Sequence, residues 1–193
     1  IAAFKKLPNE QRRVPENVAI VIQMRSLVDD APDKVLGAID KMEEKLSLSI
    51  TAREALLWAR LKCFERMGNY DQMLSYLNRL AESSPEGWQM EQIYPAIKAL
   101  PSPQNRFDVA NAMLPSLTNL PSMDRRFRVM IIDAQLELGK FETAYTEAKT
   151  FLELYPRAGD GWRVFAIAAA RTDKPFEADR AWKTITAVSY THL

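Results

Sequence analysis

The chain has 193 residues, 47% of them hydrophobic and 26% charged, which excludes wholesale disorder. Lys and Arg total 26 against 25 for Asp and Glu, and both signs are spread along the chain, so the charge balance speaks against nucleic acid or a membrane surface as partner. No apolar run approaches the ~18 residues that a membrane-spanning helix needs.

Cysteine usage and the chain ends say little about compartment. Cys63 is the single cysteine, so it can form no internal disulfide, and its apolar helical surroundings predict a buried structural thiol. The compartment stays open between cytoplasm and periplasm, with the cytoplasm slightly favoured. Because the chain starts at Ile1, we expect a fragment of a longer protein. The ending 189–193 resembles translated adapter sequence and is interpreted as a non-native tail, the alternative being a natural one; it contains His192, which we therefore exclude from any mechanism.

In chain order, residues 1–15 are expected to be the remnant of a preceding helix and a linker. Residues 16–50 then form a first helix pair, with a turn near Pro32. Residues 54–87 form a second, introduced by a capping box at Thr51. Its first helix ends at Gly68, because glycine adopts the left-handed conformation without strain, and Pro85 helps to end its second helix.

Residues 88–124 depart most from this pattern, because five prolines cut the segment into short pieces. Its length suits one degenerate hairpin, with Ser102 as the N-cap of the second helix. The alternative is a break between two sub-stacks, which would act as a hinge or a bend.

The last two units, 125–158 and 159–188, repeat the spacing of the second. Gly139 precedes Pro156 by 17 residues, as Gly68 precedes Pro85. In the final unit, Asp173 and its neighbours replace the glycine at the turn. Large or small apolar residues recur about every 34 residues on the inner face of each helix, which predicts stacked hairpins. The main columns are Ile22, Leu57, Arg128 and Trp162 in the first helices, and Ala38, Met73, Ala144 and Ala178 in the second. Arg128 must reach solvent, whereas Trp162 and Trp182 are expected to pack between hairpins.

These columns, turns and prolines resemble the tetratricopeptide repeat (TPR), a helix–turn–helix unit of about 34 residues. The resemblance covers 16–188 and implies an all-α, right-handed superhelical stack of antiparallel helix pairs. In such an array the first helix of each pair, helix A, lines a concave wall. The implied function is a scaffold that holds a peptide or a partner helix in this groove.

Helix A residues turned away from the core are therefore the candidate partner-binding residues: Trp58, Lys62, Arg66, Arg126, Asp133, Glu137, Arg163 and Arg171. Some arrays of this family hold a C-terminal carboxylate in a clamp of lysines, asparagines and arginine. Trp58, Met130 and Val164 stand where its asparagines would fall, so we expect no such clamp. The alternative interpretation of each candidate is a solvated polar position.

We expect no enzyme, since no phosphate-binding loop, metal-ligand cluster or nucleophile–base motif is present in the sequence. No cofactor or metal is implied, and the oligomeric state is left open. A second hypothesis is a non-catalytic repeat segment of a larger enzyme, secretion factor or membrane-anchored assembly protein, which docks or spaces a neighbouring domain.

Overall fold

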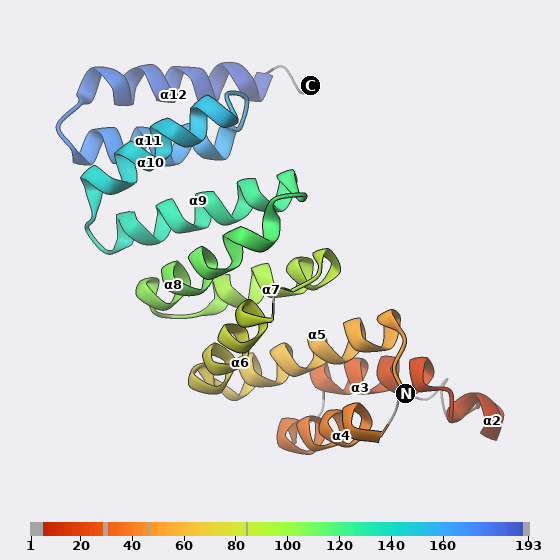
Figure 1. The fold of residues 1–193 in the computed structure, drawn as a ribbon. Coiled ribbons are helices and arrows are strands. Elements are labelled where there is room, and N and C mark those ends of the chain that lie inside the picture. Colours follow the sequence, from red (N-terminus) through yellow and green to blue (C-terminus); the bar gives the residue numbers. More distant parts are fainter. Residues whose placement is uncertain (1–5, 29–30, 46, 84, 191–193) are drawn as a thin grey trace. The chain divides into compact units, whose positions relative to one another are not determined.

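The computed structural model describes residues 6–28, 31–45, 47–83 and 85–190, and its side chains except those of Lys45 and 186–190. Within these ranges all regular elements are helices (Figure 1). The all-α fold class expected from the sequence is confirmed. The interpretations placed on residues 1–5 and 191–193 lie outside the described residues. The chain forms two compact units, residues 1–99 and 100–193, which are described in turn.

Helix α5 is the centre of the first unit. This unit contains α2 (Asn9–Arg12), α3 (Pro15–Val28), α4 (Pro32–Lys45), α5 (Ile50–Met67), α6 (Tyr70–Glu82) and α7 (Gly87–Ala99). Helix α5 packs against α3, α4, α6 and α7. Its core joins Ile22 of α3, Ile39 of α4 and Leu56 of α5, and Cys63 is completely buried there. The prediction of a buried thiol at Cys63 is confirmed.

Helices α9 and α11 organise the second unit. It contains α8 (Pro103–Met113), the 3₁₀ helix η1 (Leu114–Leu117), α9 (Pro121–Glu137), α10 (Phe141–Leu154), α11 (Gly159–Arg171) and α12 (Pro175–Tyr190). Helix α9 packs against α8, α10 and α11, and α11 packs against α12. The two helices of the degenerate range 88–124 thus fall in different units. Whether that range is one repeat or a break remains a proposal.

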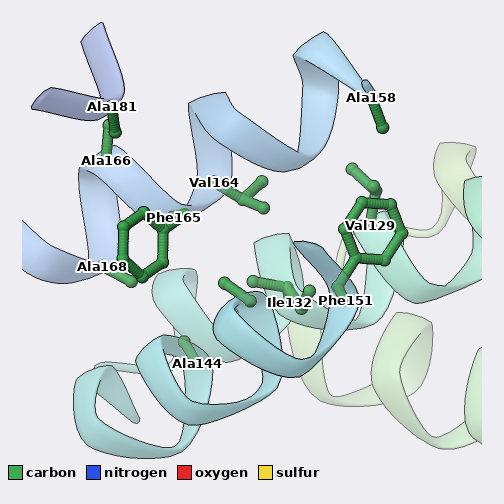
Figure 2. Packing of buried hydrophobic residues seen from close by; sticks show 11 residues of the cluster. Val129, Ile132, Ala144, Phe151, Ala158, Val164, Phe165, Ala166, Ala168 and Ala181 are labelled. Carbon is green, nitrogen blue, oxygen red and sulfur yellow. The ribbon is translucent and has the colours of Figure 1, made fainter. Parts of the chain in front are cut away.

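A single core joins four helices of the second unit, α9, α10, α11 and α12 (Figure 2). Val164 of α11 and Ile132 of α9 belong to this cluster, and the ring of Phe151 lies beside Val129. Small residues such as Ala144 and Ala166, both fully buried, let the helices approach closely. Each hairpin therefore hides its apolar face against the next one, as stacked repeats require.

Three of the turns between paired helices share one backbone conformation. Gly68, Gly139 and Asp173 have φ angles of 62°, 73° and 61°. The prediction that glycine ends helix A in the left-handed region is confirmed at both glycines. Asp173 takes the same conformation, and aspartate is one of the few other residues that tolerates it.

The predicted helix starts are right in one case and displaced in another. Ser102 Oγ accepts a hydrogen bond from Asn105 N at 3.3 Å, so the predicted N-cap of α8 is confirmed. The capping box at Thr51 is wrong, because α5 begins at Ile50 and Ser49 Oγ accepts from Ala52 N at 3.3 Å. Ser49 takes the role because it is the residue with extended backbone geometry, which an N-cap requires.

The packing predicted for Trp182 is also wrong, since its side chain is 47% exposed. Ala178 and Ala181 form the face of α12 that packs against α11. Trp182 is among the residues of α12 that this packing leaves exposed. Trp162, in contrast, is half-buried against the core and donates Nε1–H to Pro156 O at 2.8 Å.

Candidate functional site

The helix A face of the second unit is hollowed between α9 and α11. This α9–α11 hollow has a volume of about 470 Å³, within the range of ligand-binding clefts. Its lining residues come from α9, the following turn, the start of α10, and α11: Asp133, Leu136, Glu137, Gly139, Phe141, Ile167 and Arg171. Asp133, Glu137 and Arg171 were candidates from the sequence, and the fold brings all three into this one hollow.

The apolar floor of the hollow was not predicted from the sequence. Leu136 and Ile167 are half-buried, and so is Phe141, which begins α10. Phe141 was not among the candidate residues, because its place in the hollow depends on the approach of α11, a contact between neighbouring hairpins that motif spacing does not reveal. Apolar floor and charged rim together resemble the construction of protein-binding surfaces.

Both carboxylates of the hollow are already engaged. Arg163 of α11 donates from Nη2 to Asp133 Oδ2 at 2.7 Å, which ties the two A helices together. Arg106 of α8 pairs with Glu137, one turn further along α9. Arg163 thus belongs to the site as the partner of Asp133.

Arg171 is held differently, at the end of α11. Its guanidinium lies over the ring of Phe141, with the Cζ atom 5.4 Å from the ring centroid. Among the described residues, no carboxylate lies within ion-pair distance of this arginine. This cation–π contact does not occupy the guanidinium N–H groups with a carboxylate, so they can donate to one on a ligand.

The remaining candidate on α9 lies outside the hollow. Arg126 is half-buried, and its Nη1 contacts Met123 Sδ at 3.4 Å. It therefore makes local contacts near the start of α9, about two turns from Asp133.

The candidate residues of the first unit make contacts within α5 and with α3. Lys62 Nζ pairs with Glu65 at 2.6 Å and lies 5.9 Å from the centroid of the Trp58 ring. Arg66 donates to the carbonyl of Ser26, near the end of α3, at 2.7 Å. Cations near a helix C-terminus stabilise its unpaired carbonyl groups, so Arg66 has a structural role here.

An arginine on α5 whose side chain is only 11% exposed, Arg60, was not among the candidates. Arg60 pairs with Asp40 at 2.7 Å and Glu43 at 2.8 Å, both on α4, and lies over the ring of Tyr76 on α6. Burial opposes the charge, but the hydrogen bond to Asp40 and the charge of Glu43 raise the pKa of Arg60 above its ordinary value. Burial also raises the pKa of Tyr76. The ion pairs join α4 to α5, and the cation–π contact joins α5 to α6, so Arg60 has a structural role.

Other shifted groups also have structural causes. The hydrogen bond that Tyr145 donates to Glu177 raises its pKa to about 12. Tyr155 donates to Asp124, which raises the pKa of that phenol too. Asp124 also accepts from Arg128 at 2.7 Å; this pair turns the arginine away from the apolar column, and its side chain is 40% exposed.

Further hollows lie outside the helix A face. One, of about 490 Å³, lies over Trp162 and Phe165, with Lys149 of α10 and Arg180 of α12 on its rim. Another, of about 540 Å³, contains Trp88 and Tyr76 in the first unit. In the described part of the chain, no cluster of His, Cys, Asp and Glu has a metal-binding arrangement. No helix there is both long and apolar enough to cross a bilayer.

Comparison with known proteins identifies the fold. No family model and no curated sequence matches the chain. Among solved structures, the "MamA RS-1 ArsTM double mutant" is similar with a TM-score of 0.61 and 13% identity, covering 93% of this chain and 97% of that one. "MamA MSR-1 C2" is similar with a TM-score of 0.51 and 14% identity, covering 94% and 99%. The chain therefore has the fold of these TPR-like, all-helical proteins.

Proposed function

We propose that this chain is a non-enzymatic scaffold that binds a segment of a partner protein in the α9–α11 hollow. The observation that carries the proposal is the convergence of two A helices on one hollow with an apolar floor and a charged rim. TPR-like stacks form such surfaces because their A helices line one side of the array.

The charge pattern supports a protein segment over a small charged ligand. Asp133 and Glu137 are neutralised by arginines from neighbouring helices, so the hollow carries no strong field of one sign. Leu136 and Ile167 offer apolar area to a side chain of the ligand. Burying an apolar anchor inside a polar rim is the usual way in which protein interfaces gain affinity.

Nuclear magnetic resonance on the 22.0 kDa chain tests the location. The probe is a dodecamer peptide selected from a random phage library against the complete chain. We expect its addition to shift the amide signals of Asp133, Ile167 and Arg171. Shifts confined to α10 and α12, around Lys149 and Arg180, or to the first unit would refute the proposed site.

A matched pair of variants tests the floor. Ile167→Glu places a charge on the apolar floor and is expected to lower the affinity for the peptide by about tenfold or more. Lys149→Glu, which changes the rim of the other hollow, should leave the affinity within about twofold of wild type. Circular dichroism and the unfolding midpoint confirm that both variants are folded. Equal loss in both variants, or loss in neither, counts against the floor.

A second candidate function has its own observation. Ile20, Met24 and Leu27 form an apolar stripe on α3 with exposures of 44%, 46% and 53%. Such a stripe favours the docking of a neighbouring domain. If docking is the function, Met24→Lys is expected to abolish binding of the neighbouring domain, whereas Ile167→Glu is not.

A further inference from the structure

The charged groups of the α9–α11 hollow are not equally available to a ligand. Asp133 is paired with Arg163, and Glu137 is paired with Arg106. Arg171 makes the stacking contact with Phe141 and has no carboxylate partner among the described residues. A basic group on the ligand would have to compete with the arginine already paired to Asp133 or Glu137. A carboxylate on the ligand would instead provide an ion-pair partner for Arg171.

The position of Arg171 suits recognition of an acid. The cation–π contact with Phe141 restricts the Arg171 side chain, which would otherwise lose much rotamer freedom on binding. The edge of the guanidinium carries parallel N–H donors that match the two oxygens of a carboxylate. Leu136 and Ile167 line the same hollow, so an apolar side chain and an acid can bind side by side.

We propose that the α9–α11 hollow selects a peptide segment in which an aspartate or glutamate, bound by Arg171, stands next to a large apolar residue seated on Leu136 and Ile167. This inference rests on the proposed function, because it specifies the ligand of the same surface.

Selection with a charge-reversed variant tests the specificity. A random dodecamer library displayed on phage is selected in parallel against the complete wild-type chain and against Arg171→Glu. Wild type is expected to enrich Asp or Glu beside a large apolar residue. Arg171→Glu is expected to lose that acid and to enrich Lys or Arg at the same place. Arg180→Glu reverses a comparable exposed arginine on α12 and should retain the wild-type preference.

Calorimetry then measures the single contact. The strongest acidic peptide and its amide counterpart (Asp→Asn or Glu→Gln) are titrated into wild type and into Arg171→Gln. In wild type the amide peptide should bind about tenfold more weakly, as expected for loss of a charge-assisted hydrogen bond. In Arg171→Gln the two peptides should bind alike. An equal loss in both chains overturns the role of Arg171.

The outcomes separate this inference from the function on which it rests. Peptides that shift the signals of Asp133 and Ile167 but show no preference for acids refute the inference and leave the proposed function standing. Acidic peptides that shift signals only outside the hollow refute both. Circular dichroism verifies the fold of each variant, and Arg171 is exposed, so loss of folding is not expected.

Discussion

Gly161 of α11 lies directly against the ring of Phe151 of α10: a β-carbon added at Gly161 would come within 2.2 Å of Phe151 Cε1. Phe151 is only 2% exposed and is held in the core that joins α9, α10 and α11 (Figure 2). The ring therefore cannot move aside without disturbing its neighbours. This contact fixes how closely the fourth and fifth hairpins expected from the sequence approach each other.

Gly161→Ala is expected to lower the free energy of unfolding by about 1–3 kcal/mol, because it overpacks this contact. Gly159→Ala is the matched control, two residues earlier in the same helix, with no atom within 4 Å of its added β-carbon. That variant should be neutral or up to about 1 kcal/mol more stable, since alanine restricts the unfolded chain. Urea unfolding monitored by circular dichroism measures both. Equal effects of the two substitutions would contradict the contact.

Substituting each of the turn residues Gly139 and Asp173 by the residue of the other turn should change the stability in opposite directions. The two residues stand 34 positions apart and share the left-handed conformation, with φ angles of 73° and 61°. Gly139→Asp should cost about 1 kcal/mol, and Asp173→Gly should gain up to about 1 kcal/mol, because only glycine adopts this region without strain. Thermal unfolding of each variant gives the sign. A loss at both positions would mean that the two turns are not equivalent.

The helix caps give a third prediction, at the start of α5. Ser49→Ala removes the hydroxyl that accepts from Ala52 N and should lower the free energy of unfolding by about 1 kcal/mol. Thr51→Ala, one residue inside the helix, should change it by less than about 0.5 kcal/mol. The difference in urea midpoints decides between the two caps. A larger effect at Thr51 would restore the cap that the sequence had suggested.

The sequence predicted those features that depend on local spacing. The left-handed glycines follow from helix ends at a fixed interval before a proline, and the Ser102 cap follows from a serine before proline. The Ser49 cap was missed because Thr51, followed three residues later by Glu54, matched the same pattern two residues further on. Local pattern thus locates a helix start to within a few residues and does not choose among neighbouring hydroxyls.

Contacts between hairpins could not be predicted from the sequence. Asp133, Glu137 and Arg171 were predicted as polar positions on helix A. The sequence did not show that Asp133 and Glu137 form ion pairs, because their partners Arg163 and Arg106 approach from other helices. The burial of Arg60 also depends on a distant helix, since its partner Asp40 is 20 residues away. The packing of Trp182 was predicted wrongly because helical spacing indicates a face of α12 and does not show which residues of that face the neighbouring helix covers.

The hydrogen bond between Tyr145 and Glu177 makes a contribution to stability that depends on pH. Tyr145 of α10 donates its hydroxyl to Glu177 Oε2 of α12 at 2.7 Å, and this bond raises the pKa of the phenol to about 12. In the unfolded chain the phenol ionises near pH 10. A group whose pKa is raised by folding contributes stability that is fully present below the unfolded value and is lost as pH rises through the folded value. The contribution of Tyr145 should therefore be constant up to about pH 9 and should decline between about pH 10 and pH 12.

Tyr145→Phe removes the ionising group and keeps the ring that stacks on Phe165 at 5.4 Å. We expect wild type to be more stable than this variant at pH 8 and the difference to shrink steadily between pH 9.5 and pH 11. Urea unfolding at each pH, followed by circular dichroism, measures it. Glu177→Gln supplies the control, because a neutral acceptor keeps the geometry and removes the charge that repels a phenolate. The alkaline loss of stability should be smaller in that variant, and a difference between wild type and Tyr145→Phe that stays constant with pH would show that the hydrogen bond does not hold the phenol neutral.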